Sequence, residues 1–390
     1  MPVSLLNPRT QAELIGRGFS RRSFGKIASL IAGGAALPFY NEPALAQLSK
    51  IGPLPPGAVK INSNENPLGP CAEAADAVHS VVKEGGRYQF EMTDALAQML
   101  AESLGVKFNM DAAASYIRVF PGSSPPLHQA VIAFCSAERP FVKADPGYEA
   151  GEWAANYIGA KAVNVPLRKT YDHDVKAMLA AAPNAGLFYV CNPNNPTGTV
   201  TSRPDIEYLV ANKPAGSVVM IDEAYIHFSK SAVPSLDLVN ADKDVIVLRT
   251  FSKLYGMAGL RVGAVIGRPD LLQKVTQWSA GMMPITGVHA AMASLQVKNL
   301  VAERRRYMSD IRDHTCDWLT SRNVEFVPSE TNCFMINVKG DGREFTKAMA
   351  AQNVYIGRAW PVWPNWVRVT VGTDDEMAKF RTAFAKVYNA

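Results

Sequence analysis

The sequence has few cysteines and histidines, and neither type is grouped as a disulfide framework or a metal site would require. Its five cysteines (Cys71, Cys135, Cys191, Cys316 and Cys333) are odd in number and widely spaced, and no C-x-x-C pair occurs. The six histidines are equally scattered. This spacing predicts neither structural disulfides nor a metal centre.

The chain also lacks a strong charge of either sign. Its formal net charge is +5 over 390 residues, and residues 1–46, with five basic and two acidic side chains, supply +3 of it. The remaining +2 is too small to favour nucleic acid as a partner. Hydrophobic residues make up 48% of the chain and charged residues 19%. These values are typical of an ordinary globular protein of this length, with room for two subdomains.

The most informative stretch is LRTFSKLYGMAGLRVG, residues 248–263. It places Lys253 just after a hydrophobic run, with Thr250 and Ser252 before it and Arg261 after it. A desolvated lysine has a lowered pKa, and its neutral amine condenses with aldehydes. Hydroxyl groups and an arginine can together hold a phosphate. The combination predicts a pyridoxal 5′-phosphate (PLP) site; the alternative is a surface turn with a structural arginine.

This stretch resembles the lysine segment of the fold-type I PLP-dependent aminotransferases of class I/II. Four other motifs carry the same resemblance, which is closest to the histidinol-phosphate aminotransferase branch and covers about residues 58–380. They are NENPLGP (64–70), NPNNPTG (192–198), DEAY (222–225) and VRVTVGT (367–373). The resemblance implies an α/β fold with a large, mostly parallel-sheet domain, helices on both faces, and a smaller α+β C-terminal domain. It also implies a homodimer.

The expected organisation has four parts. They are a signal peptide (1–46), an N-terminal arm with part of the small domain (47–85), a large PLP-binding domain (86–280), and a bridging helix with the small C-terminal domain (281–390). Strand-then-helix alternation through the middle favours a parallel sheet. A long helix is expected from Val288 to Leu319, and its Arg304-Arg305-Arg306 run is interpreted as a solvated face. The tryptophans at 360, 363 and 366 fit either a core or a pocket.

The resemblance also implies a role for individual residues. Lys253 holds PLP and moves the proton, Asp222 pairs with the ring nitrogen, and Tyr225 shares the phenolic oxygen with Asn195. Tyr148 stacks on the ring. The residues expected to bind the cofactor are Gly122, Ser123, Ser124, Tyr148, Asn195, Asp222, Tyr225, Thr250, Ser252, Lys253, Arg261 and, across the dimer interface, Tyr88.

The substrate is expected to meet Arg368, Arg358 and Asn66, with Arg368 gripping its α-carboxylate. Two places depart from the family pattern. Ser123-Ser124-Pro125-Pro126 stands where the family has Gly-x-Asp-Glu, and Gln89-Phe90 replaces a Pro-Asp pair after Tyr88. The first departure puts the identity of the substrate in doubt.

The N-terminus carries Ser20-Arg21-Arg22-Ser23-Phe24-Gly25-Lys26, an uncharged run from Ile27 to Phe39, and Ala44-Leu45-Ala46. This order is typical of a signal peptide, and the twin arginines resemble a twin-arginine translocation (Tat) signal. The apolar run is too short and glycine-rich for a good membrane span. We expect export to the periplasm by the Tat machinery and cleavage near Ala46; the alternative is an amphipathic arm.

The function implied is a transaminase (EC 2.6.1 class), which moves an amino group between an L-amino acid, or a histidinol-phosphate-like amine, and a 2-oxo acid. A PLP-dependent decarboxylase or oxidase on the same scaffold is the alternative, and a binding protein without turnover is a third reading. Histidinol phosphate itself is disfavoured, because an exported enzyme would be separated from cytosolic histidine synthesis.

Overall fold

A seven-stranded sheet organises most of the chain in the computed structural model, which describes residues 54–277 and 281–388. Its strand order is β2-β8-β7-β6-β5-β3-β4, and only β8 runs antiparallel to its neighbours. The strands are β2 (Ile117–Phe120), β3 (Phe141–Asp145), β4 (Ala162–Pro166), β5 (Leu187–Cys191), β6 (Val218–Asp222), β7 (Val245–Thr250) and β8 (Gly263–Gly267). The expected mostly parallel sheet is confirmed.

Helices cover both faces of this sheet because its central strands are hydrophobic on both sides. Met220 and Leu248 pack into one core with α6 and α7, whereas Ile221 and Val247 pack into a second core with α8 and α9. The helices along this part of the chain are α4 (Ala72–Val81), α5 (Phe90–Leu104), α6 (Ser124–Phe134), α7 (Ala150–Ile158), α8 (Val175–Ala181), α9 (Arg203–Asn212), α10 (Leu236–Asn240) and α11 (Pro269–Thr276). Short 3₁₀ turns lie at Val82–Glu84, Ala112–Ala114, Ile226–Phe228 and Ala258–Leu260.

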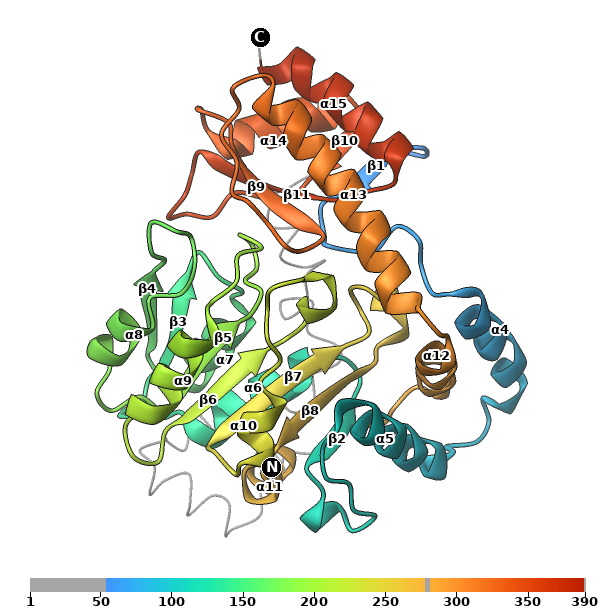
Figure 1. The fold of residues 1–390 in the computed structure, drawn as a ribbon, viewed down its shortest axis with the longest axis vertical. Helices are drawn as coiled ribbons and strands as arrows, with labels where there is room; N and C mark the ends of the chain where they lie inside the picture. Colours follow the sequence, from blue (N-terminus) through green and yellow to red (C-terminus); the bar gives the residue numbers. More distant parts are fainter. Residues whose placement is uncertain (1–53, 278–280, 389–390) are drawn as a thin grey trace, which may run out of the picture.

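Two small sheets form a separate layer above the large one (Figure 1). In the first, β1 (Val59–Ile61) pairs in parallel with β10 (Val354–Ile356), so the start of the described chain joins its end. In the second, β9 (Cys333–Asn337) pairs antiparallel with β11 (Trp366–Thr370). Helices α14 (Gly342–Ala351) and α15 (Asp374–Tyr388) pack on these strands. The α/β class with a smaller α+β part is confirmed.

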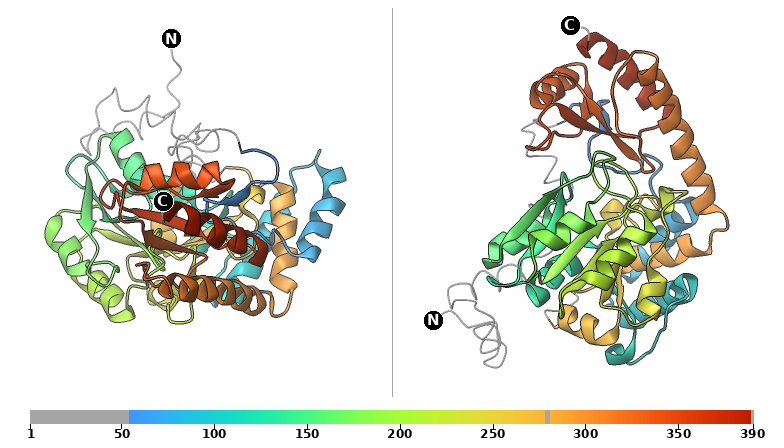
Figure 2. Two further views of the ribbon diagram at one scale, coloured as in Figure 1. Left: turned by 90° about the horizontal axis from the view of Figure 1, so that it is seen from above. Right: turned by 60° about the vertical axis from the view of Figure 1, so that its left-hand side comes forward.

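The expected single helix from Val288 to Leu319 is wrong, because it is two helices. Helix α12 (Ile285–Gln296) packs against α4, and α13 (Leu300–Thr320) runs from there up to the small sheets (Figures 1 and 2). Between them Val297 is extended and Asn299 adopts a left-handed φ of 63°. Asparagine tolerates this conformation, so the chain turns without the glycine or proline that usually signals a break.

No helix within residues 54–277 and 281–388 is long and apolar enough to cross a membrane. The expected signal peptide lies outside the described residues. Phe326 pairs with Ile336 of β9 in an isolated antiparallel bridge.

The interpretation of Arg304 as part of a solvated helix face is also wrong. Its side chain is only 7% exposed, and Nη1 donates hydrogen bonds to the carbonyl oxygens of Gly69 (2.7 Å) and Leu254 (3.1 Å). Arg306, two residues on, is exposed as expected. Arg304 therefore fastens α13 to two loops that are distant in sequence.

We expect Arg304→Ala to lower the free energy of unfolding by about 2 kcal/mol, because hydrogen bonds from a charged donor to buried carbonyls are lost. Arg306→Ala is the matched control and should change it by no more than about 0.5 kcal/mol. Urea denaturation of the two variants makes the comparison. Equal stabilities would show that the buried contacts of Arg304 contribute nothing.

Candidate active site

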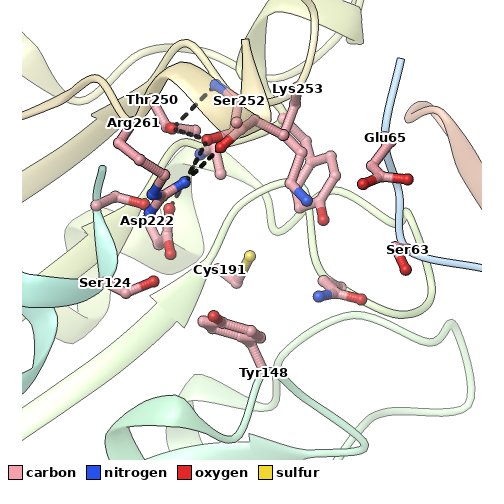
Figure 3. Close-up of a pocket in the computed structure, with 16 residues that line it drawn as sticks. Ser63, Glu65, Ser124, Tyr148, Cys191, Asp222, Thr250, Ser252, Lys253 and Arg261 are labelled. Carbon is pink, nitrogen blue, oxygen red and sulfur yellow. Dashed lines mark hydrogen bonds between the residues drawn. The ribbon is translucent and has the colours of Figure 1, made fainter. Parts of the chain in front are cut away.

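A cavity of about 300 Å³ lies at the carboxyl ends of the parallel strands, where open α/β sheets bind ligands. The loops after β2, β3, β5, β6 and β7 and the segment after β1 all reach it (Figure 3). The residues that line it are Ser63, Glu65, Ser123, Ser124, Tyr148, Cys191, Asn195, Asp222, Ala224, Tyr225, Thr250, Ser252, Lys253, Ala258, Gly259 and Arg261.

One end of the cavity is built to receive an anion. Thr250 Oγ1 donates to Ser252 Oγ (2.9 Å), and Arg261 Nη1 lies 3.5 Å from the same oxygen (Figure 3). Ser124 begins α6, whose N-terminal amide groups and dipole favour negative charge. Hydroxyls, a guanidinium and a helix N-terminus together fit a phosphate group.

Arg261 is the strongest sign that an anion belongs there. Its guanidinium contacts carbonyl and hydroxyl oxygens, with Nη1 donating to Ala258 O (2.9 Å) and Nη2 to Pro121 O (3.3 Å). It forms no ion pair with any carboxylate in the part of the chain that the structure describes. Burial lowers the pKa of its guanidinium below the usual range. A half-buried cation of this kind gains most from an anionic ligand.

Gly122 does not line the cavity, yet it is needed beside Arg261. A Cβ at this position would lie 2.1 Å from Arg261 Nη2, and the residue has a φ of +91°. Glycine alone meets both constraints without strain. The turn after β2 can therefore approach the arginine closely enough to complete the anion-binding end.

Asp222 ends β6 and lines the cavity as a buried carboxylate (Figure 3). Tyr189 Oη donates to its Oδ2 (2.8 Å), and the backbone N–H of Ala224 donates to its Oδ1 (3.0 Å). Burial raises the pKa of Asp222 to about 6, although these hydrogen bonds and the charge of Lys253 lower it in part. A protonated ring nitrogen would restore the charge balance that burial removes.

Lys253 follows β7 and is half-buried in the cavity wall, with its Nζ 5.6 Å from the centre of the Tyr225 ring. The Tyr225 hydroxyl accepts a hydrogen bond from Asn64 Nδ2 (2.9 Å). Tyr148 faces the same space from the loop after β3 (Figure 3). An amine, a phenol and an aromatic face thus line the same cavity as Asp222 and the anion-binding end.

The NENPLGP segment (64–70) contacts the loop that follows β7 and carries Lys253. Asn66 Nδ2 donates to Leu254 O (2.7 Å), so Asn66 supports the loop and does not itself line the cavity. Gly256 has a φ of +70°, and a Cβ there would lie 2.0 Å from Gly69 O. This close approach explains why a glycine follows the lysine so soon.

Three other expected residues also lie outside the cavity lining. Arg368 is buried on β11, where Nη1 donates to Asn195 Oδ1 (3.0 Å) and Nη2 to Asn62 O (2.8 Å). It therefore reaches the cavity wall through Asn195. Arg358 forms an ion pair with Glu149. Tyr88 is 67% exposed and stacks on Phe90, away from the cavity of its own chain.

Sequence reasoning missed some residues that shape the cavity. Cys191 lines it, and Tyr189, on the same face of β5, holds Asp222. Ser63 and Glu65 line the end opposite Arg261 (Figure 3). A signal was present, because Cys191 directly precedes NPNNPTG and Glu65 lies within NENPLGP.

The residues present fit PLP. The anion-binding end matches its phosphate, the buried carboxylate matches its ring nitrogen, and Lys253 matches its aldehyde. These groups line one continuous cavity, and each supplies the charge or nucleophile that its part of the cofactor needs.

Comparison with known proteins agrees with this geometry. Residues 56–384 match the family described as aminotransferase class I and II. A histidinol-phosphate aminotransferase of Moorella thermoacetica is 31% identical over 336 residues, which cover 84% of this chain and 85% of the relative. An aromatic amino acid aminotransferase of Rhodococcus jostii is 33% identical over 332 residues, which cover 85% of this chain and 90% of the relative.

The fold matches as well. The structure of a histidinol-phosphate aminotransferase from Sinorhizobium meliloti in complex with pyridoxal-5′-phosphate aligns with a TM-score of 0.78 at 25% identity. The alignment covers 91% of this chain and 96% of that one. The chain therefore belongs to the class I and II aminotransferases, a family of PLP-dependent enzymes, and is itself a PLP-dependent aminotransferase.

Proposed function

We propose that this aminotransferase moves the amino group of an L-α-amino acid to a 2-oxo acid and that Lys253 carries the chemistry. The observation behind the proposal is the joint lining of one cavity by Lys253, Asp222 and the anion-binding end. The names of relatives, which include histidinol-phosphate and aromatic amino acid aminotransferases, support it. A histidinol-phosphate-like amine is the second candidate donor, favoured by those names alone.

Each wall of the cavity has a proposed role in holding the cofactor. Thr250, Ser252, Arg261 and the turn 122–124 bind its phosphate. Asp222 would accept a hydrogen bond from the protonated ring nitrogen. Asn195 and Tyr225 would bind the phenolic oxygen, and Tyr148 would cover the ring. The hydrogen bond from Tyr189 keeps the Asp222 carboxylate in place and favours its ionised form.

PLP, when bound, supplies a conjugated ring that can take up the electron pair left at the substrate α-carbon. The Lys253 amine takes the proton from that carbon as a general base and later returns a proton as a general acid. Arg368 binds the α-carboxylate through its planar guanidinium and so fixes the orientation of the donor. Excluding water from the cavity lowers the local dielectric constant and so strengthens each of these charge interactions.

We further propose a homodimer in which Tyr88 of one chain reaches the phosphate end of the other. The exposed Tyr88–Phe90 pair, with ring centroids 5.4 Å apart, supports this because exposed aromatic pairs favour interfaces. Sedimentation velocity should give the mass of two chains. The mass of one chain would contradict the proposal.

Lys253→Ala should abolish the visible absorbance of the lysine-bound cofactor and all multiple-turnover transamination, because no other group at this position can form the covalent link. Lys230→Ala, at an exposed lysine, is the control and should behave as the wild type. The assay follows oxo acid, carbon dioxide and peroxide after amino acids are supplied. Sustained transamination by Lys253→Ala would overturn the assignment, and carbon dioxide or peroxide from the wild type would favour a decarboxylase or an oxidase.

Arg368→Ala and Arg261→Ala should separate substrate binding from cofactor binding. A charged bidentate pair contributes roughly 1.5–3 kcal/mol, so Arg368→Ala should lower kcat/KM for α-amino acids about 10- to 150-fold with the cofactor spectrum intact. Amines without a carboxylate should be affected much less. Arg261→Ala should instead weaken PLP retention, measured by dialysis. An equal loss on carboxylate-free amines in Arg368→Ala would make Arg368 structural.

We also propose Tat export to the periplasm, motivated by the SRRSFGK string ahead of an uncharged run. Arg21→Lys together with Arg22→Lys should leave the precursor in the cytoplasm, because the translocase reads the arginine pair itself. Cell fractionation and N-terminal sequencing of the mature protein test this. Unchanged delivery of the variant, or a mature wild type that still begins near Met1, would contradict export.

A further inference from the structure

Glu149 forms an ion pair with Arg358 and so neutralises an arginine that could otherwise bind the substrate. Glu149 follows the cavity residue Tyr148, and Arg358 follows β10. Their side chains are only 15% and 11% exposed, and Arg358 Nη2 donates to Glu149 Oε2. The two residues are 209 positions apart in the sequence, so the pair links the large sheet to the small ones.

Trp360 places this pair close to the proposed carboxylate-binding arginine. The guanidinium carbon of Arg358 lies 4.0 Å from the centre of the Trp360 ring, and that of Arg368 lies 5.5 Å from it. The two guanidinium groups are therefore no more than about 9.5 Å apart. Trp360 Nε1 also donates to Gly147 O (3.1 Å), which ties the ring to the loop that carries Tyr148.

This spacing suits a donor with two anionic groups, one on each arginine, if Arg358 were available. Its charge is already balanced by Glu149, however. A second anion on the substrate would have to displace a largely buried carboxylate or lie beside it, and both cost free energy. Glu65 adds another carboxylate at the cavity end opposite Arg261.

We infer that Glu149 is a specificity-determining residue that selects donors whose side chains carry no second anionic group. The preferred class is L-α-amino acids with uncharged side chains, in preference to L-aspartate, L-glutamate and phosphorylated amines. The inference rests on the proposed function, since it assigns Arg368 to the α-carboxylate. An unfavourable charge contact with the wrong substrate is a common source of such discrimination.

L-Glutamine and L-glutamate test this well, because their side chains have nearly the same shape and differ in charge. The first half-reaction is followed on the PLP-loaded protein by the absorbance change of the cofactor. Single-turnover rate constants remain measurable for slow donors. The ratio of the glutamine to the glutamate rate constant should exceed one in the wild type, and Glu149→Gln should lower it at least about tenfold by accelerating glutamate.

Two further variants isolate the charge effect. Glu152→Gln removes a carboxylate of α7, the helix that begins just after Glu149, and this carboxylate pairs with Lys143 of β3 (3.2 Å). This variant should leave the ratio unchanged. Adding Arg358→Gln to Glu149→Gln should abolish the gain with glutamate, because the freed cation is then gone.

The inference is overturned if the wild type prefers glutamate, or if Glu149→Gln changes the ratio by less than about tenfold. Equal losses with both donors would make the pair a purely structural link. These results differ from a failure of the proposed function, in which the wild type would convert no amino acid to an oxo acid. If the protein reacts with both donors and Glu149→Gln leaves the ratio of the two rate constants unaltered, only the specificity claim is contradicted and the proposed function stands.

Discussion

The site depends on burying charged groups that the protein does not fully neutralise by itself. Arg261 forms no ion pair with the carboxylates of the described residues, and the pKa of Asp222 is raised to about 6 by burial. Both conditions cost free energy in the folded chain. A cofactor with a phosphate at one end and a protonated nitrogen in its ring offsets both costs, so binding and the organisation of the cavity are coupled.

The sheet brings these groups together because its parallel strands all end at one edge. Asp222 is the last residue of β6, Thr250 the last of β7, and the Tyr148 loop follows β3. Rigid strands fix the starting point of each loop, and close-approach glycines such as Gly122 and Gly256 set how tightly the loops meet. The small sheets then add Arg368 and Arg358 from the opposite side.

Strand-then-helix alternation predicted the mostly parallel sheet, because hydrophobic runs followed by Asn, Asp or Gly specify strand and turn locally. The residues at the strand ends were identified by the resemblance of their motifs to a known family. Local sequence failed where a long-range contact decides the outcome. The break at Asn299 carries no glycine or proline, and the burial of Arg304 depends on loops at Gly69 and Leu254. The Glu149–Arg358 pair joins positions that no periodicity relates.

A crystal structure of the PLP-loaded protein tests the central claim most directly. It should show continuous electron density from Lys253 Nζ to the cofactor. The phosphate should lie within hydrogen-bonding distance, about 3 Å, of Arg261 and Ser252, and the ring nitrogen should face Asp222 at a similar distance. A phosphate bound away from Arg261, or a ring nitrogen turned away from Asp222, would contradict the account.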